Sequence, residues 1–442
     1  MFTLDSKYGE VIVYAETVEQ EAISQILAMA NAPIGEDAHM RIMPDCHAGS
    51  GCTVGTTMRI NDKVCANTVG VDIGCGMAVF KLDFAKNSAA VFDDEALFKR
   101  FLKDLDFTIN SCIPSGMNIH DHPTKNGRDF EAKLEKLHCF CELEVSYILR
   151  SVGSLGGGNH FIELNKTSQG DYVLVIHTGS RYLGKAVATY YQKRAIRELK
   201  SMTKEREALI IRYRNEGREH ELQAALKALK PIAFPKDLAY CEGELFDMYI
   251  HDMKIVQEYA ELNRRTIAEG ITKNFKSADG LSIKLTHSFS TFHNYIDTEN
   301  MLLRKGAVSA QKDELLIIPL TCVTARSFAG ARAIPIGTSP LLMARADLCR
   351  APTLRRLFRW MSMSGLWRRF TRARLNHLPL MRRPRLTNPW TRLFAALRIP
   401  LRLLTLSSLF TISKHINSIR GIYKNGVSAR YSVSFCLSTV LY

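Results

Sequence analysis

The sequence predicts an α+β fold, with a glycine-rich and mostly β central core, peripheral helices and a helical hairpin insertion. Residues 41–80 predict the core, because short Val and Ile runs alternate with glycines that permit tight turns. Residues 185–230 predict the insertion, because a long and strongly charged helical pattern is interrupted near Gly217. Strand-like and loop-like patterns return at 282–296 and 306–319, so the core is built from distant parts of the chain.

Local periodicity predicts the remaining elements. Apolar residues over 10–14 (EVIVY) predict a short strand, and apolar residues three to four apart over 17–31 predict a helix. Strands with functional loops at their ends are expected at 154–164 (SLGGGNHFIEL) and 172–181 (YVLVIHTGSR). Further helices are predicted over residues 91–107, 129–151 and 243–267.

Composition indicates a globular protein of a reducing compartment. The chain has 442 residues, of which 46% are hydrophobic, so it can bury a substantial core. Its start, MFTLDSKYGEVIVYAET, lacks a secretory signal, and its 11 cysteines show no paired spacing. The apolar run 394–412 carries Arg398, Pro400 and Arg402, which disfavours a membrane helix. We therefore expect a cytoplasmic protein with no membrane partner.

The net charge of +15 is concentrated in one segment. Residues 321–442 contain 21 Lys and Arg, 19 of them arginine, and a single acidic residue, Asp347. Residues 1–320 contain 38 basic and 43 acidic residues, so this part is mildly acidic. Such asymmetry is typical of a tail that binds nucleic acid or a membrane, but the reading frame offers another explanation, given below.

Five residues have the composition of a metal centre. Asp72 and Cys75 lie in GVDIGCGM, and three histidines lie in loops of small residues: His160 after GGGN, His177 before TGSR, and His293 in STFHNYI. A divalent cation would keep the thiol deprotonated. Thiolate and imidazole favour zinc, whereas the carboxylate also permits manganese. Asp72 and Cys75 alone would equally fit a buried cysteine beside a turn, so the three histidines decide in favour of a metal.

Other polar residues are candidates for supporting roles. Asp45 and His47 in MPDCHAGSG fit either a capped tight turn or a position that supports the site. Arg181 after HTGS, and Arg304 with Lys305 in RKGAVSA, are candidate cations for binding phosphate.

Across residues 1–320 the chain resembles the RtcB family, through PDCHAGSG, GVDIGCGM, SLGGGNHFIEL, VIHTGSRYLG, HNYI and RKGAVSA in this order. The resemblance implies an RtcB-like fold and a GTP- and manganese-dependent RNA ligase. Such ligases join a 3′-phosphate or 2′,3′-cyclic phosphate end to a 5′-hydroxyl end. The implied partners are tRNA halves or broken RNA ends, in tRNA splicing or RNA repair.

The resemblance also implies roles for individual residues. Cys75 would bridge two manganese ions, one of which would also take Asp72 and His160, and the other His177 and His293. Asp45 and His47 would support the site. The implied guanylate contacts are Asn159, His160, Phe161, Ile162, Glu163, His293 and Asn294.

The chain departs from the family pattern after Leu320. The family attacks GTP with a histidine in a motif resembling HGAGR, and this chain has no such motif. Read one base earlier, the codons from Leu320 into Arg326 permit Asn-Met-Arg-Asp-Gly-Ser. Those from Arg332 through Asp347 permit Gly-Asn-Pro-Asp-Trp-Asn-Phe-Ser-Ala-Pro-His-Gly-Ala-Gly-Arg. We therefore predict two parts, a catalytic body at 1–320 and an out-of-frame, disordered tail at 321–442.

Three alternatives to an active RNA ligase stay open. The first is a truncated ligase or pseudoenzyme that binds metal without activity. The second is a phosphoesterase dependent on zinc or another metal, built on the same ligand set. The third is an RNA-binding protein whose affinity depends on residues 321–442 and falls steeply with salt.

Overall fold

The computed structural model describes residues 1–84, 94–167, 170–229, 234–277, 280–312, 314–318, 327–330 and 340–342. The predicted tail at 321–442 therefore lies outside the described residues, apart from two short strands. These are β15 (Ser327–Gly330), which pairs with β14 (Leu315–Ile318), and β16 (Pro340–Leu342), which pairs with β13 (Ala307–Ser309).

A six-stranded sheet forms one part of the β core, in the order β1-β2-β3-β4-β12-β11. Strands β2 and β3 are parallel, and the other neighbours are antiparallel. Helix α1 (Gln20–Ala30) makes the connection between β2 and β3, and it buries Ala22, Ile26 and Met29 at helical spacing. The strands are β1 (Phe2–Ser6), β2 (Gly9–Val13), β3 (Arg41–His47), β4 (Val54–Arg59), β11 (Asn294–Asp297) and β12 (Leu302–Lys305).

A four-stranded antiparallel sheet carries the predicted ligands. Its order is β10 (Ile283–Phe292), β6 (Gly76–Phe84), β8 (Tyr172–Thr178) and β7 (Phe161–Lys166). The register pairs Gly76 with both Thr178 and Phe292, and Phe161 with His177. Because β6 and β7 begin where β8 and β10 end, the loops that contain the ligands meet at one edge of this sheet.

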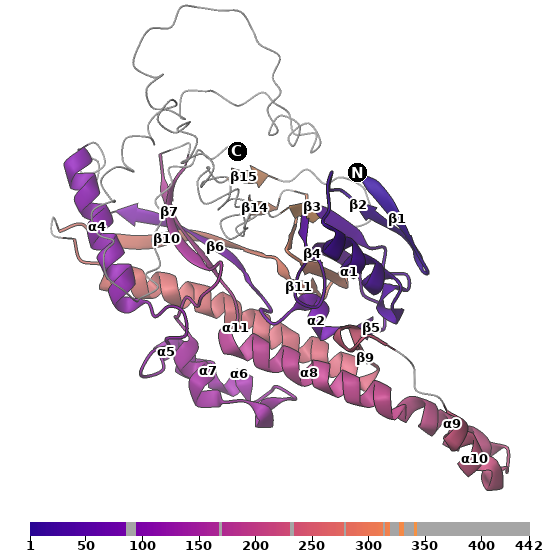
Figure 1. Cartoon of the computed structure of the whole chain (residues 1–442). Coiled ribbons are helices and arrows are strands. Elements are labelled where there is room, and N and C mark those ends of the chain that lie inside the picture. The colour runs from indigo at the N-terminus through magenta and orange to yellow at the C-terminus, as the bar shows by residue number, and fades with distance from the viewer. Residues whose placement is uncertain are drawn as a thin grey trace, which may run out of the picture. The chain divides into compact units, whose positions relative to one another are not determined.

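Long helices pack against this sheet. Helix α11 (Glu244–Asn274) contacts β6, β8 and β10, and α8 (Arg181–Ser201) runs beside it (Figure 1). Helix α4 (Glu95–Cys112) begins at Asp94, whose carboxylate accepts the N–H groups of Ala96 and Leu97. Its apolar face joins the core through Phe101 and Leu105. Shorter elements are β5 (Lys63–Val64), α2 (Ala66–Val69), α5 (Lys125–Asp129), α6 (Glu131–Leu134), α7 (Val145–Ser151), α9 (Thr203–Asn215), α10 (Leu222–Ala228) and β9 (Cys241–Glu242).

The α+β class is confirmed, and the main differences concern helices. The single helix predicted over 129–151 is wrong, because α6 ends at Leu134 and α7 begins only at Val145. Between them, the buried carboxylate of Asp252 accepts the N–H groups of His138 and Cys139. This side chain therefore replaces the backbone acceptors that a continuous helix would need.

The predicted hairpin insertion is smaller than residues 185–230. Its first part belongs to α8, which is buried along Val187, Tyr191 and Ala195 and ends where Met202 adopts a left-handed conformation. Helices α9 and α10 form the hairpin, with Gly217 at φ +64° in its turn. Within the described part of the chain, no helix is both long and apolar enough to cross a membrane.

Candidate metal centre

The loop before β6 brings Asp72 and Cys75 to the edge of the sheet. The backbone N–H of Cys75 donates to the carbonyl of Asp72 (3.1 Å), and Gly74 donates to the carbonyl of Asn294 (2.7 Å). Gly74 has φ +72°, where a Cβ would lie 3.0 Å from Ala260. A side chain at this position would therefore push the loop away from α11.

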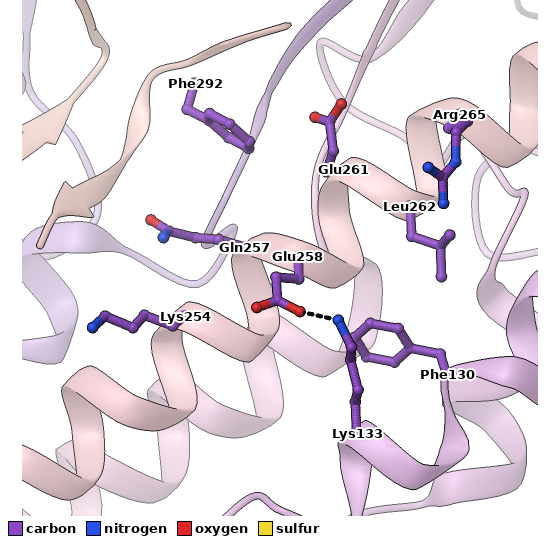
Figure 2. Close-up of a pocket in the computed structure, with 9 residues that line it drawn as sticks. All are labelled: Phe130, Lys133, Lys254, Gln257, Glu258, Glu261, Leu262, Arg265 and Phe292. Carbon is purple, nitrogen blue, oxygen red and sulfur yellow. Dashed lines mark hydrogen bonds and ion pairs between the residues drawn. The ribbon is translucent and has the colours of Figure 1, made fainter.

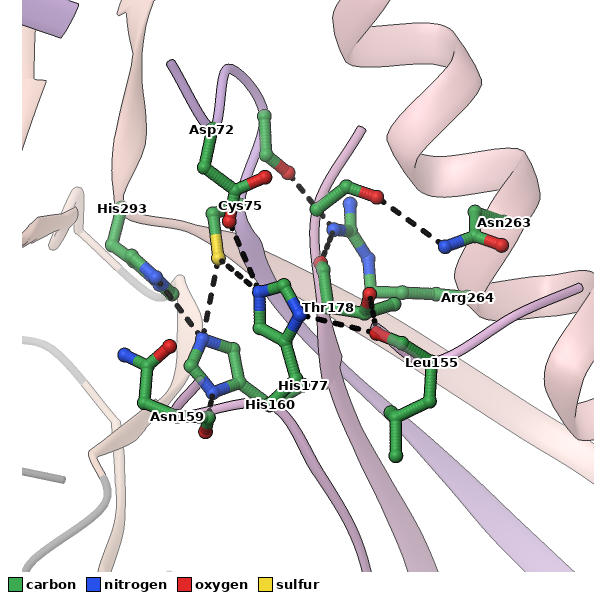
Figure 3. Close-up of polar contacts among 12 residues, drawn as sticks. Asp72, Cys75, Leu155, Asn159, His160, His177, Thr178, Asn263, Arg264 and His293 are labelled. Carbon is green, nitrogen blue, oxygen red and sulfur yellow. Dashed lines mark hydrogen bonds and ion pairs between the residues drawn. The ribbon is translucent and has the colours of Figure 1, made fainter. Parts of the chain in front are cut away.

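Five side chains from four separate segments of the chain converge at this edge (Figure 3). Sγ of Cys75 lies 3.5 Å from Nε2 of His160 and 3.4 Å from Nε2 of His177. Nε2 of His177 lies 3.2 Å from Nε2 of His293, and Nε2 of His160 lies 3.0 Å from Oδ2 of Asp72. Three of the residues, Cys75, His160 and His177, place one potential ligand atom each within 4.8 Å of one another.

Backbone carbonyls orient two of the imidazoles. Nδ1 of His160 lies 3.1 Å from the carbonyl of Leu155, and Nδ1 of His177 lies 3.1 Å from the carbonyl of Asn159. A carbonyl only accepts hydrogen bonds, so each Nδ1 carries a proton, and each Nε2 is the ring atom that faces the centre. A hydrogen bond from the ring nitrogen that does not bind the metal to a backbone carbonyl is typical of metal-binding histidines. The donor set of one carboxylate, one thiol and three imidazoles therefore fits a metal ion, which would take the place of the protons that these groups now share.

Burial sets the charges of the centre. Burial and the nearby Asp72 carboxylate raise the pKa of the Cys75 thiol well above its ordinary value. Burial lowers the pKa of His293 to about 3, so its ring is neutral at physiological pH. Burial acts to raise the pKa of Asp72, but the hydrogen bond and charge of His160 outweigh it and lower this pKa to about 2. The centre thus holds one carboxylate and a thiol that a cation must deprotonate.

Sequence reasoning missed Arg264, which supports the centre from α11. Its guanidinium is fully buried and donates to the carbonyls of Gly74 (2.9 Å) and Thr178 (2.7 Å). Gly74 directly precedes Cys75, and Thr178 directly follows His177. It also pairs with Glu261 at 2.9 Å and lies 4.8 Å from the ring centroid of Phe292. In the sequence, this arginine sits in a charged helix and resembles a solvent-exposed residue. Its role depends on which face of α11 meets the sheet.

Replacing Arg264 with Met is expected to lower the free energy of unfolding by about 3–5 kcal/mol, because two buried carbonyls lose their donor. The adjacent Arg265 supplies a matched control, since its side chain is 59% exposed. Arg265→Met is expected to change stability by about 0.5 kcal/mol or less. Urea unfolding of both variants measures the difference, and equal stabilities would contradict the supporting role of Arg264.

The other predicted site residues occupy several environments. Asn159 holds His177 through its carbonyl, and the Phe161 ring lies 5.1 Å from the His177 ring. Ile162 and Glu163 are buried in β7, and the amide oxygen of Asn294 accepts the N–H of Gly306 at 3.0 Å. The guanylate contacts of these residues stay predictions. Asp45 and His47 lie in β3 of the other sheet, and their supporting role is likewise still a prediction.

The candidate phosphate-binding cations are engaged within the protein. Arg181 donates to Ser154 (3.0 Å) and to the carbonyl of Gly116 (2.9 Å). Arg304 is buried and pairs with Asp297 at 3.3 Å. Lys305 is buried and donates to the carbonyls of Ser50 (2.6 Å) and Asn67 (3.4 Å). These contacts give the cations structural roles in the described chain.

A pocket of about 560 Å³ lies along α11 and includes none of the five predicted ligands (Figure 2). Phe292, which directly precedes His293, forms part of its wall, and an ion pair between Lys133 and Glu258 crosses from α6 to α11. The pocket is lined by Phe130, Lys133, Lys254, Gln257, Glu258, Glu261, Leu262, Arg265 and Phe292.

Comparison with known proteins places this site in a family. The family model described as tRNA-splicing ligase RtcB matches residues 25–150 and 144–328. The chain is 27% identical over 329 residues to the RNA-splicing ligase RtcB of Escherichia coli K12, and this alignment covers 68% of the chain and 72% of that relative. It is 24% identical over 355 residues to the tRNA-splicing ligase RtcB of Methanococcus maripaludis, and that alignment covers 67% of the chain and 66% of the relative. It is 25% identical over 361 residues to the tRNA-splicing ligase RtcB of Archaeoglobus fulgidus, with 69% of the chain and 68% of the relative aligned. Because the family model spans most of the chain and all five converging residues, the chain belongs to the RtcB family.

Proposed function

We propose that this chain derives from an RNA ligase that joins 3′-phosphate or 2′,3′-cyclic phosphate ends to 5′-hydroxyl ends, with GTP and two Mn²⁺ ions. The convergence of Asp72, Cys75, His160, His177 and His293 carries the proposal. The relatives are named RNA-splicing and tRNA-splicing ligases, which supports tRNA halves or broken RNA ends as substrates. None of the eight described cysteines forms a disulfide, which supports the cytoplasm as its location.

The five converging residues would hold the metal. Cys75 lies between His160 and His177, so its sulfur suits a shared position between two ions. Asp72 with His160, and His177 with His293, would supply the remaining protein ligands of each ion. The bound ions would orient a phosphate and neutralise charge that develops during transfer.

The protein's own groups prepare this site before metal binds. The carbonyls of Leu155 and Asn159 hold two imidazoles with their Nε2 atoms toward the centre, so little rotamer freedom is lost on binding. Arg264 fixes the two loops through Gly74 and Thr178. Asn159, Phe161 and Asn294 lie beside the ligands in sequence and are the residues we assign to the guanylate.

We assign residues 321–442 to an out-of-frame tail that lacks the guanylate-accepting histidine. The family match ends at residue 328, which supports a boundary close to Leu320. On this account the body at 1–320 binds metal, but the chain with its present tail does not transfer GMP. This is the truncated-ligase alternative, applied to this chain.

An RNA-joining assay tests the proposed function. Two RNA strands, one ending in a 3′-phosphate and one beginning with a 5′-hydroxyl, are incubated with Mn²⁺, GTP and the chain with its frame restored by one base before codon 321. Joined RNA that requires both GTP and Mn²⁺ is expected. Release of inorganic phosphate without joining, supported by Zn²⁺ and independent of GTP, would instead favour the phosphoesterase alternative.

Mn²⁺ binding is expected to tighten as pH rises. The Cys75 pKa is raised, so the free site carries a thiol, and the metal must displace its proton. His293, with a pKa of about 3, is already neutral and releases no proton in this range. Between pH 7 and 8.5 the dissociation constant should therefore fall roughly tenfold per pH unit, as for one displaced proton. Calorimetry in buffers of different ionisation enthalpy measures the proton released, and a pH-independent affinity would contradict the thiol as a ligand.

A further inference from the structure

A second histidine pair lies outside the metal centre. His138 is in the turn that replaces the predicted helix after α6, and His251 is in α11. Their ring centroids are 4.9 Å apart, with an angle of 68° between the planes. Both residues are exposed, so an ion from solution can reach the two rings.

The carboxylate of Asp252 holds this pair together. Its side chain is fully buried and accepts the backbone N–H groups of His138 (3.0 Å) and Cys139 (3.3 Å) and the hydroxyl of Tyr191 (2.7 Å). The oxygen that accepts from His138 also lies 3.0 Å from Nδ1 of His251. One carboxylate oxygen thus fixes both the turn that carries His138 and the ring of His251.

The charge of Asp252 lacks a permanent counter-ion. Within the described part of the chain it forms an ion pair with His251 but with no Lys or Arg. A buried carboxylate is stabilised by a nearby positive charge, which a cation bound at the histidine pair would supply.

We propose that His138 and His251, oriented by Asp252, form a second metal site, for one Zn²⁺ ion. His251 donates from Nδ1 to the carboxylate, so its Nε2 is the ligand atom, in the arrangement common to zinc-binding histidines. His138, His251 and Asp252 each have a nitrogen or oxygen within 4.8 Å of the other two, and solvent can complete the coordination of an ion held by the two rings. Imidazole ligands without a thiolate suit Zn²⁺ better than Mn²⁺. The ion would tie α11 to the turn between α6 and α7.

Zinc binding to the full metal-free chain tests the site. Equilibrium dialysis should give one Zn²⁺ per chain fewer for the double variant His138→Gln, His251→Gln than for the wild type. Both positions are exposed, so the variant should fold. His220→Gln is the matched control, because His220 is exposed and pairs with Glu221 at 3.5 Å, away from the two histidines of the proposed site. An unchanged count in the double variant, or an equal loss in the control, would overturn the proposal.

Cobalt substitution separates this site from the first centre. Co²⁺ bound to Cys75 should give a thiolate charge-transfer band, whereas Co²⁺ bound to two imidazoles should not. The double variant is expected to keep this band at full strength while it loses one ion. Loss of the band together with the ion would assign that ion to the Cys75 centre and overturn the second site.

Discussion

Replacement of Cys75 with Ala is expected to weaken Mn²⁺ binding at least about 100-fold, because the sulfur faces both His160 and His177. Loss of a ligand shared by two ions should affect both, so the variant should retain fewer than two tightly bound ions. Equilibrium dialysis against Mn²⁺ at pH 8 gives the affinity and the number of ions directly.

Cys141→Ser is the matched control for this experiment. Cys141 is a free and exposed thiol that belongs to neither group of potential ligands. Its replacement should leave Mn²⁺ affinity unchanged. The Cys75→Ala variant removes one buried sulfur and should lose only about 1 kcal/mol of stability, so a thermal melt can separate weak binding from unfolding. Wild-type affinity in a folded Cys75→Ala variant would exclude the sulfur as a ligand.

Restoring the reading frame is expected to change covalent GMP transfer from undetectable to readily measured. One base inserted before codon 321 gives a frame that permits the missing HGAGR motif, because the bases of the Leu342 and Met343 codons allow a histidine codon. In the proposed mechanism a histidine accepts GMP and so splits the ligation into easier steps, and the present frame supplies no such histidine in this motif. Incubation with GTP labelled in its α-phosphate, followed by denaturing electrophoresis, detects the adduct.

Two controls make this comparison specific. The restored chain with the new histidine codon changed to alanine should not be labelled. The restored chain without added Mn²⁺ should not be labelled either, because the metal centre is then empty. Labelling of the chain in its present frame would refute the assignment of residues 321–442 to an out-of-frame tail.

The sequence was most informative about the metal centre. That Asp72, Cys75, His160, His177 and His293 come together could be anticipated, because each lies in or beside a turn of small residues at the end of an apolar strand; their role as metal ligands stays a prediction. The register of β6, β7, β8 and β10 then explains why five residues spread over 222 positions meet at one edge.

Long-range contacts explain what the sequence did not predict. Arg264 resembles a surface residue until the packing of α11 against β6 and β8 is known, and its two carbonyl partners come from distant loops. The helix predicted over 129–151 fails for the same reason, because Asp252 is more than 100 positions away from the N–H groups that it accepts. Local periodicity carries no information about either contact.

Anomalous diffraction at the manganese edge, from crystals of the chain grown with Mn²⁺, tests the proposed centre most directly. Two peaks are expected next to Sγ of Cys75, one beside Asp72 and His160 and the other beside His177 and His293. Direct contact between the cysteine and the imidazoles, with no anomalous peak among them, would contradict the metal centre and the ligase function built on it.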